Sequence, residues 1–364
     1  MKPKARIMHL PVYQPGKPID EVKKELGLTD VIKLASNENP LGCSPKAKEA
    51  IINHLEQTNI YPDGASVELT AAIATKFGLK SDQIVFGAGS DEVILMIARA
   101  YLSPGDETIM ADRTFPQYKH NALVEGATVI EVPLKHGTHD LQAMLQQVTD
   151  KTKVIWVCNP NNPTSTIVTH AEVEDFLKRV PSTVLVVLDE AYAEYITTDI
   201  YPDGLALLQQ HPNVILLRTF SKAYGLASLR IGYGMGRAEV IRSINQVREP
   251  FNTTGFAQVA ALAALLDEPF LQHCRQANAA GLTYLTENFR RLGLSYFPAY
   301  GNFVLVDTQR DAKQMYESLL RKGIIVRGGH TASIGFPTMI RVTVGTEQQN
   351  QAFIKAFEEV LSDD

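Results

Sequence analysis

Residues 218–230 read Arg-Thr-Phe-Ser-Lys-Ala-Tyr-Gly-Leu-Ala-Ser-Leu-Arg, and they carry the most specific chemical signal in the chain. Lys222 follows two hydroxyl side chains, and Arg230 comes eight residues after it. A lysine amine can form a Schiff base with an aldehyde, while Thr219, Ser221 and Arg230 can bind a phosphate group on the same molecule. The stretch therefore predicts a covalently held phosphorylated aldehyde, for which pyridoxal 5'-phosphate (PLP) is the obvious candidate. A lysine taken alone is usually a solvated surface residue, so the prediction depends on the rest of the chain.

A buried strand supplies the next group that this cofactor needs. Residues 184–188 form a continuous apolar run, typical of a buried parallel strand, and Asp189-Glu190-Ala191-Tyr192 follows it. An aspartate can pair with a protonated pyridine nitrogen and keep the ring an effective electron sink. A helix cap is the simpler role for Asp189, but ligands of such sheets bind at this carboxyl edge. We therefore expect Asp189 at the ring nitrogen and Tyr192 at the phenolic oxygen of the ring.

A second strand leads to an amide-rich turn. Residues 154–158 form this strand, and Asn159-Pro160-Asn161-Asn162-Pro163-Thr164 follows it. Side-chain amides in such a turn can reach the same ring oxygen, and we select Asn162 for this contact.

A glycine turn provides candidate phosphate donors. The expected strand 83–86 leads into Gly87-Ala88-Gly89-Ser90, and an apolar helical pattern begins at Val93. Because a helix N-terminus attracts anions, Ala88, Gly89 and Ser90 are candidates, although a Gly-x-Gly turn alone is a weak signal. Phe115 follows the next strand, residues 107–111, where it can stack on the ring, although such a residue is more often part of a core.

Eight segments in a fixed order resemble those of fold-type I PLP-dependent aminotransferases, and within that group those of the histidinol-phosphate aminotransferases. The segments are Tyr13-Gln14-Pro15-Gly16-Lys17, Ser36-Asn37-Glu38-Asn39-Pro40-Leu41-Gly42, Tyr61-Pro62-Asp63-Gly64, Gly89-Ser90-Asp91-Glu92, the asparagine–proline turn, Asp189-Glu190-Ala191-Tyr192, the lysine segment and Ile340-Arg341-Val342-Thr343-Val344-Gly345. Their joint occurrence is very specific for the fold type and less specific for the substrate. The resemblance implies amino transfer between L-histidinol phosphate and 2-oxoglutarate, in histidine biosynthesis.

The resemblance also implies roles for individual residues. Lys222 would be the Schiff-base lysine, and Arg341 would hold a substrate carboxylate through a bidentate pair, which suits a guanidinium. The cofactor contacts would be Ala88, Gly89, Ser90, Phe115, Asn162, Asp189, Tyr192, Thr219, Ser221, Arg230 and, from the neighbouring subunit of a homodimer, Tyr61. The far end of the substrate would meet Tyr13, Asn302 and Arg327. The chain departs from the family at Ser165 and Ser228, where glycine is usual or frequent, and we expect only local turns to change there.

Several other functions fit parts of the sequence. A nicotinamide dehydrogenase would use the Gly87-Ala88-Gly89 turn, but it leaves Lys222, Arg230 and the asparagine–proline turn unexplained. A PLP-sensing transcription regulator would need an added DNA-binding domain, and too few residues precede the first cofactor motif to hold one. Aromatic aminotransferases and PLP-dependent decarboxylases of the same fold remain the nearest alternatives.

The patterning along the chain predicts an α/β protein. Between about residues 81 and 234, apolar strands alternate with helical stretches, which favours a doubly wound, mostly parallel sheet. From about residue 270, a long helix, short strands and a closing helix indicate a smaller α+β domain. We expect an N-terminal arm at residues 1–45 that contributes to the small domain, a large PLP-binding domain at 46–265 and the small domain at 266–364. A chain of 364 residues is long enough for two cores.

Charge, hydropathy and cysteine content indicate which classes of binding partner to expect. The net charge is −5, and no basic cluster is visible, so nucleic acid is not an expected partner. No apolar run approaches membrane-spanning length, and no signal-type core follows the first residues, so we expect a cytoplasmic enzyme. The three cysteines fit reduced thiols, and the two histidines and aspartate of residues 135–140 do not form a closed metal-ligand set. The expected partners are a small-molecule amino donor and a 2-oxo acid.

Overall fold

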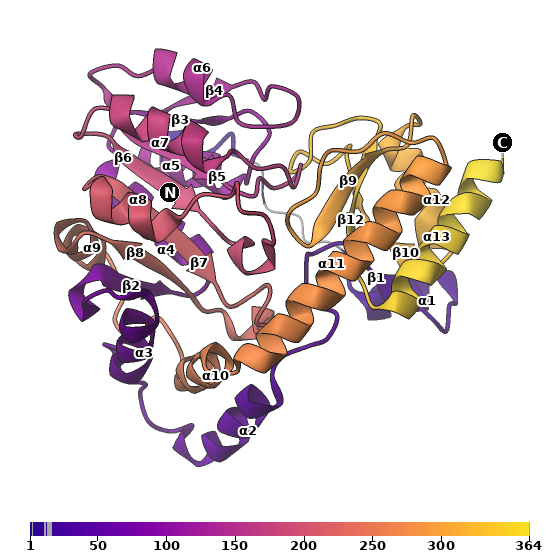
Figure 1. Ribbon diagram of the computed structural model, residues 1–364, viewed down its shortest axis with the longest axis horizontal. Coiled ribbons are helices and arrows are strands. Elements are labelled where there is room, and N and C mark those ends of the chain that lie inside the picture. Colours follow the sequence, from indigo (N-terminus) through magenta and orange to yellow (C-terminus); the bar gives the residue numbers. More distant parts are fainter. Residues whose placement is uncertain (2, 11, 13–16, 364) are drawn as a thin grey trace.

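A seven-stranded sheet forms the centre of the larger part of the molecule (Figure 1). The computed structural model describes residues 1, 3–10, 12 and 17–363. In spatial order the strands are β2 (Ile84–Gly87), β8 (Gly232–Gly236), β7 (Val214–Thr219), β6 (Leu185–Asp189), β5 (Thr152–Cys158), β3 (Glu107–Ala111) and β4 (Thr128–Val132). Only β8 runs antiparallel to its neighbours in this sheet, so the other strands are parallel to one another.

Helices cover both faces of this sheet because its strands are apolar on both faces. In β6, Val186 and Leu188 join one core cluster while Leu185 and Val187 join another. The first cluster packs against α2 (Pro45–Asn53), α3 (Val67–Phe77), α6 (Leu141–Gln146), α7 (His170–Arg179), α8 (Gly204–Gln210) and α10 (Gly255–Leu265). The second packs against α4 (Ser90–Tyr101), α5 (Gln117–Glu125) and α9 (Ala238–Asn245). This arrangement is doubly wound, as predicted.

The smaller part is built on a three-stranded antiparallel sheet. Its spatial order is β11 (Arg327–Gly328), β12 (Met339–Thr343) and β9 (Phe303–Asp307). The long helix α11 (Glu268–Arg291), α12 (Ala312–Arg321) and α13 (Glu347–Ser362) accompany it (Figure 1). A separate core of apolar side chains from these elements holds the part together. The structure confirms the α/β fold with a smaller α+β part.

The N-terminal segment packs with the smaller part, although residue 1 lies beside the larger one (Figure 1). Strand β1 (Ile32–Lys33) pairs in parallel with β10 (Ile324–Ile325), 292 positions further along the chain. Helix α1 (Ile19–Leu26) buries Val22 against Ala35 and Ile325. Helix α1 was not predicted, because the segment was interpreted as polar with little periodicity, although Ile19, Val22 and Leu26 recur at helical spacing. The boundaries at residues 45 and 265 stay a prediction.

The remaining described elements are short 3-10 turns at η1 (Ala5–Ile7), η2 (Leu55–Gln57), η3 (Ser81–Gln83), η4 (Ala193–Tyr195) and η5 (Ala227–Leu229). Within the described part of the chain, no helix combines the length and apolar character needed to cross a membrane.

Candidate active site

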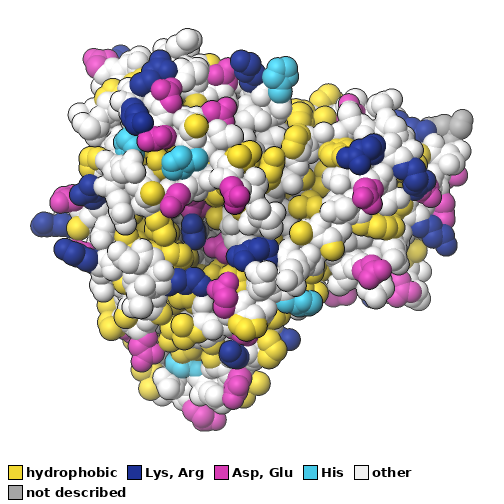
Figure 2. Space-filling view, in the orientation of Figure 1, with side chains coloured by type: hydrophobic (Ala, Val, Ile, Leu, Met, Phe, Trp, Pro, Cys, Tyr) yellow, Lys and Arg dark blue, Asp and Glu magenta, His cyan; other side chains and the backbone are white. Residues whose placement is uncertain are grey.

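The predicted site residues meet at the carboxyl edge of the large sheet. Strand β6 ends at Asp189, β7 ends at Thr219 and β5 ends just before the asparagine–proline turn. Because these strands are parallel neighbours, their carboxyl ends lie side by side, where open α/β sheets bind ligands. Near the centre of the face in Figure 2, beside α11, basic and acidic side chains lie close together.

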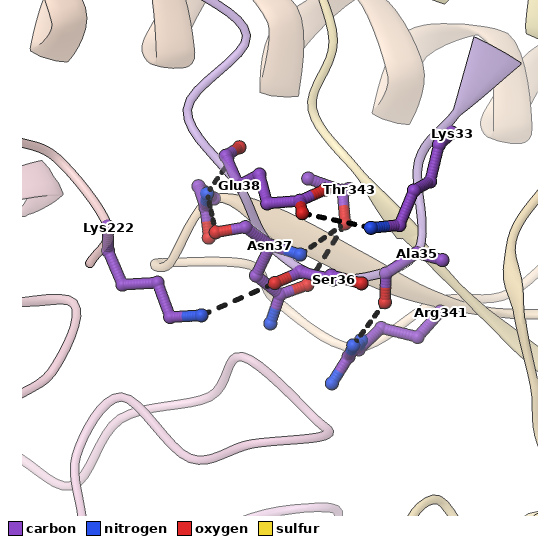
Figure 3. Close-up of polar contacts among 9 residues, drawn as sticks. Lys33, Ala35, Ser36, Asn37, Glu38, Lys222, Arg341 and Thr343 are labelled. Atoms are coloured by element: carbon purple, nitrogen blue, oxygen red, sulfur yellow. Dashed lines mark hydrogen bonds and ion pairs between the residues drawn. The ribbon is translucent and has the colours of Figure 1, made fainter. Parts of the chain in front are cut away.

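Lys222 reaches from the large part toward the N-terminal segment. Its Nζ donates to the carbonyl oxygen of Ser36 at 3.3 Å and lies 5.9 Å from the ring centre of Tyr192 (Figure 3). Burial and the nearby Arg341 lower the pKa of Lys222 to about 8, against the opposing influence of Asp91 and Glu38. A lysine in this state has a substantial neutral fraction near neutral pH, which a nucleophile or base requires.

Asp189 is buried at the end of β6. It accepts hydrogen bonds from the Tyr118 hydroxyl, 2.5 Å from Oδ2, and from the backbone N–H of Ala191, 3.2 Å from Oδ1. Both donors are neutral, so neither supplies a positive charge to pair with the carboxylate. Burial raises the pKa of Asp189 to about 6, while the Tyr118 hydrogen bond lowers it. A cationic ring nitrogen would supply the missing positive charge.

The ring of Tyr118 packs against two other aromatic side chains. It stacks on Trp156 with ring centres 4.9 Å apart, and the indole N–H of Trp156 donates to Thr108 Oγ1 at 2.8 Å. Phe115 contacts Tyr118 in a T-shaped arrangement, with 5.6 Å between ring centres. Phe115, the predicted stacking ring, and Asp189, the predicted partner of the ring nitrogen, thus both contact Tyr118.

Asn162 and Tyr192 are the two residues predicted to contact the ring oxygen of the cofactor. In the structure, the side chains of both form hydrogen bonds with neighbouring residues. The hydroxyl of Tyr192 accepts from Asn37 Nδ2 at 3.0 Å, and the ring packs edge-on against Phe303. Asn162 Oδ1 accepts from Arg341 Nη1 at 2.6 Å, which leaves its amide nitrogen as a possible donor. Asn162 thus joins a predicted cofactor contact to a predicted substrate contact.

The predicted phosphate pocket is assembled around Arg230. The guanidinium donates to Ser221 Oγ at 3.3 Å and to the Ala88 carbonyl at 3.3 Å, and it lies 3.6 Å from Asp91. Helix α4 begins at Ser90, and Gly89 before it has φ +81°. A Cβ at Gly89 would lie 2.5 Å from Arg230 Nη2, so only glycine lets the arginine approach the helix end.

Thr219 and Ala88, two of the predicted phosphate contacts, already have hydrogen-bond partners within the protein. Thr219 Oγ1 accepts from the backbone N–H of Ser221 at 3.1 Å, and its hydroxyl donates to the Ile231 carbonyl at 3.5 Å. The Ala88 N–H donates to Glu92 Oε2 at 2.6 Å. In this arrangement the Ala88 amide is already used, which departs from its expected role as a phosphate donor. Gly89 and Ser90 are left as the amide donors at the helix end.

Arg341 lies buried between the two parts of the molecule. Nη1 donates to Asn162, and Nη2 donates to the Ala35 carbonyl at 2.6 Å (Figure 3). Among the described residues, its buried Nε has no hydrogen-bond partner. Burial lowers the pKa of Arg341 to about 10, and Arg327 contributes to this lowering, so the side chain is still a cation at neutral pH. An anion beside Nε would satisfy both the charge and the unpaired donor.

Arg327 stands directly opposite Arg341 in the sheet. The two residues are register partners in the antiparallel pair β11–β12, so their side chains leave the sheet on the same face. Arg327 Nη2 makes one long hydrogen bond, 3.4 Å, to Ser333 Oγ. Like charges directly opposite each other are unfavourable unless an anion lies between or beside them.

Asn302 and Asn37 connect the substrate side of the site to Tyr192. Asn302 Nδ2 donates to the Asn37 carbonyl at 3.0 Å, while its buried Oδ1 has no partner among the described residues. Asn37 has φ +55° and exchanges hydrogen bonds with Thr343, and its amide donates to Tyr192. Figure 3 shows the segment of residues 35–38 between Lys222 and Arg341.

Among the predicted site residues that the structure describes, Tyr61 is not brought to this cluster. Tyr61 is 80% exposed and stacks on Phe251, with ring centres 4.8 Å apart. Tyr13 lies outside the described residues.

The comparisons with known proteins agree with this geometry. The sequence model of the family "Aminotransferase class I and II" matches residues 29–357. The chain belongs to the class I and II aminotransferases. Over 362 residues it is 54% identical to the histidinol-phosphate aminotransferase of Brevibacillus brevis, covering 100% of this chain and 99% of that protein. It is 51% identical over 363 residues to that of a Geobacillus species, with 100% and 99% covered.

A solved structure extends the likeness to three dimensions. The histidinol-phosphate aminotransferase of Sinorhizobium meliloti, in complex with PLP, superposes on this aminotransferase with a TM-score of 0.89 at 27% identity, covering 98% of this chain and 97% of that one. The chain is thus a PLP-dependent enzyme of the fold predicted from its sequence.

The residues of this aminotransferase fit PLP on chemical grounds. The buried Asp189 has only neutral donors, the amine of Lys222 has a lowered pKa, and Arg230 lies at the open N-terminus of α4. These three groups match the pyridine nitrogen, the aldehyde and the phosphate of the cofactor, respectively. Bound there, PLP supplies an electron sink for the bonds of the substrate's amine-bearing carbon.

Two residues of the site were not selected from the sequence. Asn37 lies within a motif that was quoted for the resemblance, yet nothing in the pattern indicated its contacts. Tyr118 follows Phe115 by three residues, which places both on one side of a helix start, and this spacing could have flagged it. Neither Asn37 nor Tyr118 is charged, so charge patterns gave no signal.

Proposed function

We propose that this aminotransferase moves the amino group between L-histidinol phosphate and 2-oxoglutarate, with imidazole acetol phosphate and glutamate as the reactants in the histidine biosynthetic direction. The observation that carries the proposal is the cross-strand pair Arg327 and Arg341. Two relatives that are 54% and 51% identical along the full chain carry the histidinol-phosphate aminotransferase name. Their names do not favour the aromatic aminotransferase or decarboxylase alternatives.

The two substrates pose a shared recognition problem. Histidinol phosphate has an amine and a phosphate but no α-carboxylate, whereas glutamate has two carboxylates. One site must therefore bind two different arrangements of negative charge. Arg341 has a buried, unpaired Nε, and Arg327 stands beside it with one long hydrogen bond. A pair of arginines accepts carboxylates and phosphates alike, because both anions match the guanidinium fork. Tyr13 and Asn302 would add contacts at the far end of the substrate.

The chemistry would be carried by few side chains. Lys222, with its lowered pKa, would hold the cofactor and then move the proton at the amine-bearing carbon of the substrate. Asp189 would keep a positive charge at the ring nitrogen, Asn162 and Tyr192 would bind the phenolic oxygen, and Phe115 would stack on the ring. The phosphate would be bound by Gly89, Ser90, Thr219, Ser221 and Arg230.

A cytoplasmic homodimer with shared sites is part of this proposal. Tyr61 and Phe251 form an exposed stacked pair. Further exposed apolar side chains lie on α2, on the turn after it and at the ends of α3 and α10, namely Ile52, Leu55, Ile60, Val67 and Leu266. An exposed apolar surface of this kind is typical of a protein interface. Through it, Tyr61 would reach the cofactor phosphate of the partner subunit.

Replacing each arginine separately tests the shared anion site. We expect Arg341→Ala to slow the half-reactions of both glutamate and histidinol phosphate, and Arg327→Ala to affect the two unequally. Losing a hydrogen bond to a charged partner costs about 1.5–3 kcal/mol, or roughly 10- to 150-fold in rate. Single-turnover rates for each donor measure this directly. Equal, small effects of both variants on both donors would contradict the proposal.

A further inference from the structure

A buried serine connects the two parts of the molecule beside the active site. Ser165 follows the asparagine–proline turn of the large part and is fully buried. Its hydroxyl oxygen accepts hydrogen bonds from the backbone N–H groups of Gly301, at 2.8 Å, and Tyr300, at 3.1 Å. Its carbonyl oxygen also accepts from the Tyr300 N–H, at 2.9 Å. Three contacts thus join segments that are 135 residues apart in sequence.

The backbone of Ser165 adopts a conformation that serine rarely uses. Its φ is +64°, in the left-handed region that favours glycine. Local hydrogen bonds impose this turn: the Ser165 N–H donates to the Asn161 carbonyl at 2.7 Å, and the Asn161 side chain bonds Thr114 and Thr164. A side chain kept at such a position needs a compensating contact, and the two backbone donors provide one.

Ser165 lies between the two ends of the substrate site. On one side, its turn contains Asn162, which accepts from Arg341. On the other side, the segment that it holds continues into Asn302, whose amide bonds the Asn37 carbonyl. The Gly301 carbonyl is held in turn by Asn278 of α11, at 3.0 Å. Any shift of residues 300–301 would therefore move Asn302 relative to Arg341.

We propose that Ser165 is a positioning residue, which holds residues 300–302 of the small part against the asparagine–proline turn in the arrangement that binds substrate. A glycine here would accept the backbone conformation but would release both N–H groups from their side-chain acceptor. The substrate-binding arrangement would then be populated less often, and the apparent affinity would fall in proportion.

Two substitutions separate backbone strain from the hydroxyl contacts. Ser165→Gly removes both the strain and the hydrogen bonds, whereas Ser165→Ala keeps the strained backbone and removes only the hydrogen bonds. Gln309→Gly is the matched control, because Gln309 has φ +58° on the surface and its replacement relieves similar strain away from the site. We expect both Ser165 variants to raise KM for glutamate about tenfold, with kcat within about twofold of the wild type, and Gln309→Gly to leave both unchanged.

Hydrogen exchange in the cofactor-free protein provides a readout that is independent of activity. The Gly301 amide, bonded to the Ser165 hydroxyl, should exchange about tenfold faster or more in both Ser165 variants, while amides of the buried strand β5 keep their wild-type rates. Unchanged Gly301 exchange together with an unchanged KM would overturn the proposal. It would also be overturned by a general loss of thermal stability in which kcat falls as much as KM rises, since that pattern indicates only a structural role.

Discussion

The hydroxyl of Tyr118 lies 2.5 Å from Oδ2 of Asp189. This buried hydrogen bond is the strongest influence that lowers the pKa of the carboxyl group against the effect of burial. Burial raises the pKa of Asp189, and Tyr118 lowers it, so that the value is about 6. The carboxylate must be ionised to pair with a protonated ring nitrogen. Tyr118 therefore helps to keep Asp189 in its functional state at neutral pH.

Replacing Tyr118 with phenylalanine should lower the ionised fraction of Asp189 near neutral pH. Without the donor, the pKa of Asp189 rises further, so the carboxylate becomes protonated at a higher pH. We expect Tyr118→Phe to move the acidic limb of the kcat/KM profile upward and to lower activity most below pH 7. The lost hydrogen bond to a charged group is worth about 1.5–3 kcal/mol.

Asp189→Asn is the comparison for this experiment. It removes the charge itself, so it should depress the rate of proton abstraction at every pH and lower cofactor affinity much less. A pH profile of Tyr118→Phe that superimposes on that of the wild type would show that Tyr118 does not tune the aspartate.

The pKa of Lys222 sets the pH dependence of cofactor capture. The neutral amine reacts with aldehydes, and its pKa of about 8 means that the neutral fraction grows about tenfold per pH unit below that value and levels off above it. We expect the rate of PLP capture by the cofactor-free protein to follow this curve. Borohydride should then fix the cofactor on Lys222, and Lys222→Ala should lose this capture along with roughly 10²–10⁴-fold of turnover or more. A capture rate that still climbs tenfold per unit up to pH 10 would contradict the lowered pKa.

Much of this site could be predicted because it lies at the ends of apolar strands. Asp189, Thr219 and the asparagine–proline turn each follow a buried run, and parallel strands bring such ends together. Lys222 follows β7 by three residues, but it was selected from the chemistry of its own segment and not from a predicted strand. Bounds were predicted for four strands of the large sheet, β2, β3, β5 and β6, and they agree with the structure to within two residues.

The parts that could not be predicted depend on pairing between distant short segments. Strands β1 and β10 have two residues each, which is too short for any periodicity to indicate that they pair. The contact of Ser165 with residues 300–301 was not predicted, because the sequence showed only a departure from glycine. Tyr118 was missed since the orientation of α5 against β6 decides its partner. The hydrogen bond from the Ala88 amide to Glu92 was not predicted, because the orientation of the Glu92 side chain cannot be derived from the sequence.

Mixed dimers test the shared site. If Tyr61 completes the phosphate pocket of the partner, Lys222→Ala and Tyr61→Ala homodimers should both have low activity. After subunit exchange, each hybrid would contain one intact site, so a one-to-one mixture should recover about a quarter of wild-type activity. Sedimentation should show a dimer throughout. A mixture no more active than its two parents, despite demonstrated exchange, would rule out a Tyr61 that acts across the interface.

The most direct test of the proposed reaction is the single-turnover rate of the PLP-loaded wild-type enzyme with histidinol phosphate, glutamate and phenylalanine, each in excess and under identical conditions. The arginine pair at positions 327 and 341 predicts rapid loss of the bound cofactor's absorbance with histidinol phosphate and with glutamate, and a much slower change with phenylalanine. The carboxylate of phenylalanine carries a single negative charge, whereas a phosphate group carries about −1.5 to −2 at pH 7 and glutamate has two carboxylates. A clear preference for phenylalanine over histidinol phosphate would contradict the proposal and identify an aromatic aminotransferase.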